Sequence, residues 1–129
     1  MVSLNPYIST GSSAKDVLIV EDEQGARRAL SLLLCSCGYR PQAFRTAEEA
    51  MTWLGGGERP AVALVDLDLP GIDGIALIEK LSQLSPKTRS ILVTATDKDS
   101  IVRRISGHGI PYLQKPLDFE GLLRLLNGQ

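Results

Sequence analysis

Hydrophobic and polar positions along this chain alternate between two spacings. Five short runs suited to strands cover residues 16–20, 39–44, 61–65, 90–93 and 110–113. Stretches with apolar residues three and four positions apart cover residues 24–38, 46–54, 73–84, 98–105 and 119–126. The first pattern is typical of buried strands and the second of amphipathic helices. The chain is therefore predicted to contain five strands that alternate with five helices.

This alternation favours an α/β fold in which parallel strands are joined by right-handed crossovers and helices cover both faces of the sheet. The result would be a three-layer α/β/α sandwich. Pro41 lacks a backbone N–H, so the strand that contains it is expected at an edge of the sheet. Thr46 and Glu49 match a capping box at the start of the second helix. Gly38 marks the end of the first helix.

Length and composition limit the class of protein. The chain has 129 residues, of which 43% are hydrophobic and 22% charged, which suits one globular domain. Residues 1–15 have no hydrophobic periodicity and are predicted to form a flexible tail, so that the domain covers 16–129. A net charge of −1 argues against nucleic-acid binding by this domain alone. No apolar run is long enough for a membrane span, and no signal peptide is recognised, so we expect a cytoplasmic protein.

Polar side chains follow four of the predicted strands. They are Glu21 and Asp22 after the first strand, Asp66 after the third, Thr94 after the fourth and Lys115 after the fifth. In an open α/β sheet these strand ends share one edge, where ligands bind. Three neighbouring carboxylates repel one another, and oxygen ligands suit Mg²⁺ or Mn²⁺. A carboxylate beside such a cation can accept a phosphoryl group, whose charge a lysine would help to balance.

Four segments together resemble the receiver domains of two-component response regulators. They are VLIVEDE (residues 17–23), DLDLPGIDG (66–74), TA (94–95) and YLQKP (112–116), and the resemblance extends from Asp16 to the C-terminus. It implies a flavodoxin-like (βα)5 fold with the strand order 2-1-3-4-5. It also implies that the chain catalyses only its own phosphorylation and dephosphorylation and is otherwise not an enzyme.

The resemblance assigns a role to each site residue. Asp66 would be the phosphoacceptor, and together with Asp22 it would bind Mg²⁺ directly. Glu21, where aspartate is commoner in the family, would bind the cation through water. The backbone carbonyl of Asp68 would supply another metal ligand. Lys115 would pair with the phosphoryl group.

Other roles implied by the family concern signalling. Thr94 and Tyr112 would form the switch pair, and Asp68 and Thr96 would tune the rate of dephosphorylation. Pro116 is expected to follow a cis peptide bond. The partners would be a sensor histidine kinase or a histidine phosphotransfer protein. A second copy could bind through the face made by the fourth helix, fifth strand and fifth helix.

Three other interpretations stay open at this point. A pseudo-receiver would bind proteins without being phosphorylated. A phosphatase of the haloacid dehalogenase type would use Asp66 and Asp68 as nucleophile and acid, but that family places its motif after the first strand. A flavin-binding module of the flavodoxin type would need a phosphate loop where the acidic residues 21–23 stand.

Overall fold

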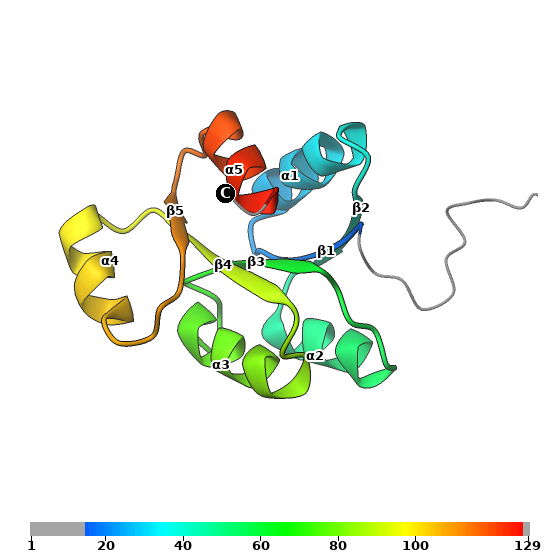
Figure 1. The fold of residues 1–129 in the computed structure, drawn as a ribbon, viewed down its shortest axis with the longest axis horizontal. Coiled ribbons are helices and arrows are strands. Elements are labelled where there is room, and N and C mark those ends of the chain that lie inside the picture. Colours follow the sequence, from blue (N-terminus) through cyan, green and yellow to red (C-terminus); the bar gives the residue numbers. More distant parts are fainter. Residues whose placement is uncertain (1–14, 128–129) are drawn as a thin grey trace, which may run out of the picture.

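A computed structural model describes residues 15–127 and contains one five-stranded parallel sheet (Figure 1). The strands are β1 (Asp16–Val20), β2 (Arg40–Phe44), β3 (Val62–Asp66), β4 (Arg89–Thr94) and β5 (Tyr112–Gln114). The helices are α1 (Gln24–Ser36), α2 (Ala47–Gly55), α3 (Gly74–Leu84), α4 (Lys98–Ile105) and α5 (Phe119–Leu126). The strand order is β2-β1-β3-β4-β5, which confirms the predicted flavodoxin-like fold. Pro41 lies in β2, an edge strand, as predicted.

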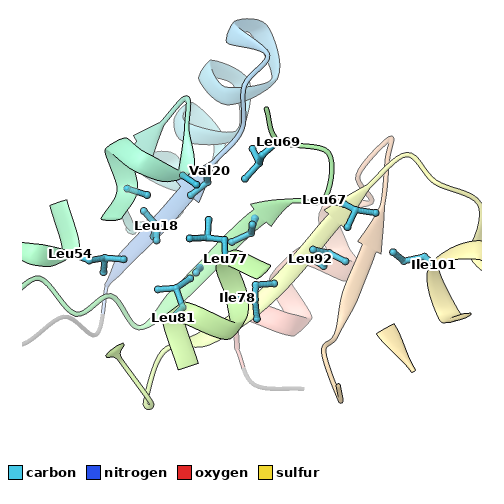
Figure 2. Packing of buried hydrophobic residues seen from close by; sticks show 14 residues of the cluster. Leu18, Val20, Leu54, Leu67, Leu69, Leu77, Ile78, Leu81, Leu92 and Ile101 are labelled. Carbon is cyan, nitrogen blue, oxygen red and sulfur yellow. The ribbon is translucent and has the colours of Figure 1, made fainter. Parts of the chain in front are cut away.

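Two apolar clusters hold the three layers together. Successive residues of a strand point to opposite faces, so β1 contributes Leu18 and Val20 to one cluster and Val17 and Ile19 to the other. The first cluster packs the sheet against α2, α3 and α4 (Figure 2). The second packs it against α1 and α5. Because both faces are covered, the polar side chains of β1, β3 and β4 lie at or next to the strand ends.

Several boundaries differ from the predicted ones. Strand β3 extends to Asp66, which pairs with Val93, so the carboxylate belongs to the sheet and does not follow it. Strand β5 begins at Tyr112 because Pro111 has no N–H to donate to the ladder. Thr46 caps α2 by accepting from the N–H of Glu49, as expected.

Other local expectations are met only in part. The Glu49 carboxylate accepts from the N–H of Arg45, one residue before the position that a capping box requires. The Lys115–Pro116 peptide bond is cis, as the resemblance implied. The predicted tail falls outside the described residues except for Lys15. Within residues 15–127 no helix has the length and apolar character needed to cross a membrane.

Gly74 allows α3 to begin directly against the end of β3. A Cβ atom at this position would clash with the carbonyl oxygen of Asp66 and would lie 2.9 Å from Cα of Leu67. The neighbouring atoms belong to the backbone, which has little freedom to move. Asp73 caps the same helix by accepting from the N–H of Ala76. The start of α3 therefore lies directly beside Asp66, at the end of β3.

Candidate functional site

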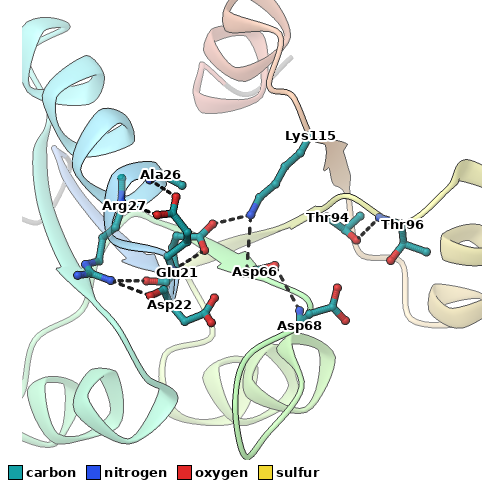
Figure 3. Close-up of polar contacts among 11 residues, drawn as sticks. Glu21, Asp22, Ala26, Arg27, Asp66, Asp68, Thr94, Thr96 and Lys115 are labelled. Atoms are coloured by element: carbon teal, nitrogen blue, oxygen red, sulfur yellow. Dashed lines mark hydrogen bonds and ion pairs between the residues drawn. The ribbon is translucent and has the colours of Figure 1, made fainter.

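The strand ends bring the predicted site residues to one edge of the sheet (Figure 3). Val20 pairs with Val65, so the segment after β1 begins next to Asp66. Thr94 pairs with Gln114, so Lys115 begins beside the end of β4. The site thus collects residues from four strand ends that are far apart in the sequence.

Three carboxylates form the centre of this site. One oxygen from each of Glu21, Asp22 and Asp66 lies within 4.8 Å of the others. Glu21 and Asp66 are only 5% and 7% exposed, whereas Asp22 is exposed. Such a cluster of oxygen ligands suits a hard divalent cation, whose remaining positions water and phosphoryl oxygens can fill. The residues present therefore fit the Mg²⁺ or Mn²⁺ that the sequence predicts.

Lys115 reaches into this cluster from the end of β5. Its Nζ donates to Oε1 of Glu21 at 2.6 Å and lies 3.7 Å from Oδ2 of Asp66. Burial alone would lower the pKa of Lys115, but the hydrogen bond with Glu21 and the two negative charges outweigh burial and raise it. The lysine is therefore a cation that already balances part of the negative charge.

The two buried carboxylates differ in their electrostatics. Burial raises the pKa of Asp66, and the negative charge of Glu21 adds to this effect, so that the pKa reaches about 6. Burial also acts on Glu21, but the hydrogen bonds from Lys115 and from the N–H of Glu23 prevail and lower its pKa. Glu21 is thus stabilised as an anion, while Asp66 binds a proton more readily than an ordinary aspartate and is still mostly ionised at neutral pH.

Arg27 supports the acidic loop and was not anticipated from the sequence. Its Nη1 donates to the backbone carbonyls of Glu21 at 2.9 Å and Asp22 at 3.3 Å. Arg27 lies on the first turns of α1, so it ties the loop to the helix that follows. The pair of adjacent arginines at positions 27 and 28 was a visible signal, but the sequence pattern does not indicate which one faces the loop.

The hydroxyl group at the end of β4 is buried and already bonded. Thr94 is 0% exposed, and its Oγ1 accepts from the N–H of Thr96 at 2.9 Å. The Thr96 carbonyl in turn accepts from Nε2 of Gln114 at 2.7 Å, a contact that was also not anticipated.

The two remaining predicted residues lie on either side of this hydroxyl group in the sequence. Tyr112 is half-buried and packs against the cluster shared by α2, α3 and α4. Asp68 is exposed, and its N–H donates to Oδ1 of Asp66 at 3.2 Å.

Comparison with protein families gives an independent result. The family model described as the response regulator receiver domain matches residues 17–127. The DNA-binding transcriptional regulator NtrC of Salmonella typhimurium is 31% identical over 111 residues, which is 85% of this chain and 24% of NtrC. A cyclic di-GMP phosphodiesterase of Thermotoga maritima is 36% identical over 84% of this chain and 29% of its own length. The chain therefore spans about a quarter of the length of these relatives.

Solved structures with the same fold agree with this assignment. A CheY-like response regulator receiver domain protein from Methanospirillum hungatei has a TM-score of 0.78 and 28% identity, over 88% of this chain and 90% of its own. The response regulator TrrA from Thermotoga maritima, solved in complex with Mg²⁺ and BeF, has a TM-score of 0.76 and 26% identity, over 88% and 96% of the two chains. The strand order, the site at the sheet edge and these matches agree, and the chain belongs to the response regulator receiver domain family.

Proposed function

We propose that this domain accepts a phosphoryl group on Asp66 in a Mg²⁺-dependent reaction and thereby changes its signalling surface. The observation that carries the proposal is the convergence of Glu21, Asp22 and Asp66 with the Lys115 ammonium at one sheet edge. The cation, when bound, would reduce the charge repulsion between the carboxylates and the incoming phosphoryl group.

Each side chain has a role in the proposed reaction. An oxygen of Asp66 attacks phosphorus, a new O–P bond forms, and the bond from phosphorus to the donor atom breaks. A phosphohistidine donor leaves as imidazole, which takes up the proton it needs from water. Lys115 lies 3.7 Å from Asp66 and stabilises negative charge on the transferred group. Asp22 and Asp66 would hold the metal directly, Glu21 would act through water, and the carbonyl of Asp68 would be a further ligand.

A sensor histidine kinase or a histidine phosphotransfer protein is the proposed phosphodonor. A groove of about 300 Å³ lies between α1 and the segment after β5, and it is lined mainly by apolar groups. Glu21 and Lys115 lie in its wall, together with Ala29, Leu33 and Pro116. A helix of the donor that packed here would bring its histidine close to the site. Such a donor would meet this domain in the cytoplasm.

The proposed output passes through the switch pair. Thr94 donates to a phosphoryl oxygen on Asp66, and Tyr112 adjusts its packing against the face made by α4, β5 and α5. The two helices of this face carry exposed apolar side chains, Val102 on α4 and Phe119 on α5, which could bind a second copy of the domain. Equal sedimentation coefficients with and without beryllofluoride, a phosphoryl mimic, would count against this dimer.

The lifetime of the phosphorylated state is assigned to Asp68 and Thr96. Asp68 is exposed and Thr96 is half-buried, and their backbones are tied to Asp66 and Thr94, respectively. Their side chains would control the approach of the water that hydrolyses the aspartyl phosphate. An unchanged decay rate after both side chains are replaced would end this assignment.

Phosphorylation by acetyl phosphate tests the proposed function. We expect the intact mass of the protein to increase by one phosphoryl group in the presence of Mg²⁺ and to stay unchanged in EDTA. Asp66→Asn should gain no mass, whereas Asp99→Asn, which changes an exposed carboxylate on α4, should behave like the natural protein. A wild-type protein that gains no mass would favour a pseudo-receiver. Turnover of a generic phosphate ester would favour a phosphatase.

A further inference from the structure

A side-chain amide connects the end of β5 to the loop after β4. Nε2 of Gln114 donates to the backbone carbonyl of Thr96 at 2.7 Å. This bond is additional to the ladder of the sheet, in which the N–H of Lys115 donates to the carbonyl of Thr94 at 2.7 Å. Gln114 is exposed, so its side chain contributes little to the core. The Gln114 amide therefore holds the loop after β4 in position and adds little to the stability of the fold.

Hydrogen bonds hold both the backbone N–H and the backbone carbonyl of Thr96. Its N–H donates to the buried hydroxyl of Thr94, and its carbonyl accepts from Gln114. Any movement of the Thr94 hydroxyl must either break its bond to Thr96 or take the loop along. Gln114 opposes movement of the loop, because its amide group holds the carbonyl of Thr96.

The order of the strands gives this restraint a direction. Strand β4 lies between β3, which carries Asp66, and β5, which carries Gln114. Asp66 and Gln114 thus flank the end of β4 on opposite sides. A shift of the loop toward a phosphoryl group on Asp66 is a shift away from Gln114, and it stretches the bond between Gln114 and Thr96.

We propose that Gln114 is a latch that holds residues 95–97 in the unphosphorylated position and so weakens the affinity of the site for a phosphoryl group. This inference rests on the proposed function of Asp66. An exposed neutral hydrogen bond is modest in strength, so the latch shifts the balance between two loop positions by about threefold to tenfold and does not block the change.

Beryllofluoride binding tests the latch. Gln114→Met removes the donor but keeps the length of the side chain, and the bond between Lys115 and Thr94 keeps β4 and β5 paired. With Mg²⁺ present, we expect the Kd for beryllofluoride, measured by fluorine NMR, to fall by about threefold to tenfold. Gln83→Met, which changes an exposed glutamine on α3, is the matched control and should bind as the wild type does.

Two further measurements separate a latch from a general structural effect. Affinity for Mg²⁺ alone should stay unchanged, because no carboxylate is altered. The amide NMR signals of residues 95–97 in Gln114→Met without beryllofluoride should move part of the way toward their positions in the bound wild type. Gln114→Leu, which removes the donor without adding a charge, should give the same result and replaces the methionine variant if that variant does not fold.

The outcomes distinguish this inference from the proposed function. If the wild type binds beryllofluoride and Gln114→Met binds it equally or more weakly, the latch is wrong while phosphorylation of Asp66 stands. If the wild type does not bind beryllofluoride at all, the proposed function fails and the latch fails with it. Tighter binding by both Gln114 variants, with unchanged binding by Gln83→Met, supports the latch.

Discussion

Lys115 and Glu21 are 94 positions apart in the chain, and the lysine Nζ donates to the glutamate Oε1 at 2.6 Å. This distance is shorter than the 3.7 Å from the same Nζ to Oδ2 of Asp66. The lysine is therefore bound mainly to a proposed metal ligand and less to the proposed phosphoacceptor. A cation bound at this cluster would compete with Lys115 for the charge of Glu21, and the proposed phosphoryl group on Asp66 would offer the lysine a new partner.

Replacement of Lys115 tests this competition. Lys115→Met leaves two buried carboxylates without their ammonium partner, and we expect the free energy of unfolding to fall by about 3 kcal/mol in EDTA. Saturating Mg²⁺ should restore most of this loss, because the cation replaces the missing positive charge. Urea unfolding with and without Mg²⁺ measures both values. Lys87→Met, at an exposed loop position, is the control, and an equal loss with and without Mg²⁺ would contradict the account.

The raised pKa of Asp66 predicts a pH-dependent stability. Burial and the charge of Glu21 raise this pKa from 3.8 to about 6, so ionisation of Asp66 destabilises the folded state. The stability associated with the protonated carboxyl is fully present below pH 3.8 and is lost as the pH rises through about 6.

Asp66→Asn removes this titration. Between pH 4 and pH 7 in EDTA, the stability of the variant relative to the wild type should therefore increase by about 2 kcal/mol. Chemical unfolding at a series of pH values measures this change. A difference that stays constant across the range would mean that the pKa of Asp66 is not raised. Gln83→Met, which removes no ionisable group, should show no such trend.

Arg27 is predicted to position the metal ligands of the loop after β1. Arg27→Gln loses the guanidinium that donates to the carbonyls of Glu21 and Asp22. With the loop less restrained, affinity for Mg²⁺, measured by isothermal titration calorimetry, should weaken by about tenfold. Arg28→Gln alters the net charge equally at an exposed position and should retain the wild-type affinity. Equal weakening in both variants would indicate a general charge effect in place of positioning.

Gly74 is predicted to be required by the packing of α3 on β3. Gly74→Ala places a Cβ against the backbone of Asp66 and Leu67, and we expect a loss of about 2 kcal/mol in unfolding free energy. Gly55→Ala, at the end of α2, meets no atom within 4 Å and should be neutral or stabilising. Thermal unfolding of the two variants gives the comparison. If both alanines had the same effect, close packing at Gly74 would not explain its presence.

The sequence predicted which residues meet at the sheet edge because a simple rule of parallel sheets applies to them. Residues that directly follow buried strands must lie at one edge, so Asp66 and Lys115 could be brought together without coordinates. The hydrogen bonds from Arg27 and Gln114 could not be predicted in this way, because their partners are backbone carbonyls. Such contacts depend on the side-chain rotamer and on the path of a loop, and neither leaves a periodic pattern.

The same distinction applies to Glu21 and to the ends of the strands. The sequence predicted Glu21 as a metal ligand but not its close bond to Lys115, since a pattern shows which groups meet and not which pair is shortest. The boundaries of β3 and β5 shifted by one or two residues from the predicted ones. These shifts arise because pairing with the neighbouring strand, and not the apolar run alone, determines where each strand ends.

Chemical mapping of the phosphorylated residue determines whether Asp66 is the phosphoacceptor. Borohydride reduces an aspartyl phosphate to homoserine, which peptide mass spectrometry locates after treatment of the domain with acetyl phosphate and Mg²⁺. We expect homoserine at position 66 and an unmodified aspartate at positions 22 and 68. Homoserine at either of these other positions, or no homoserine at all, would contradict this expectation.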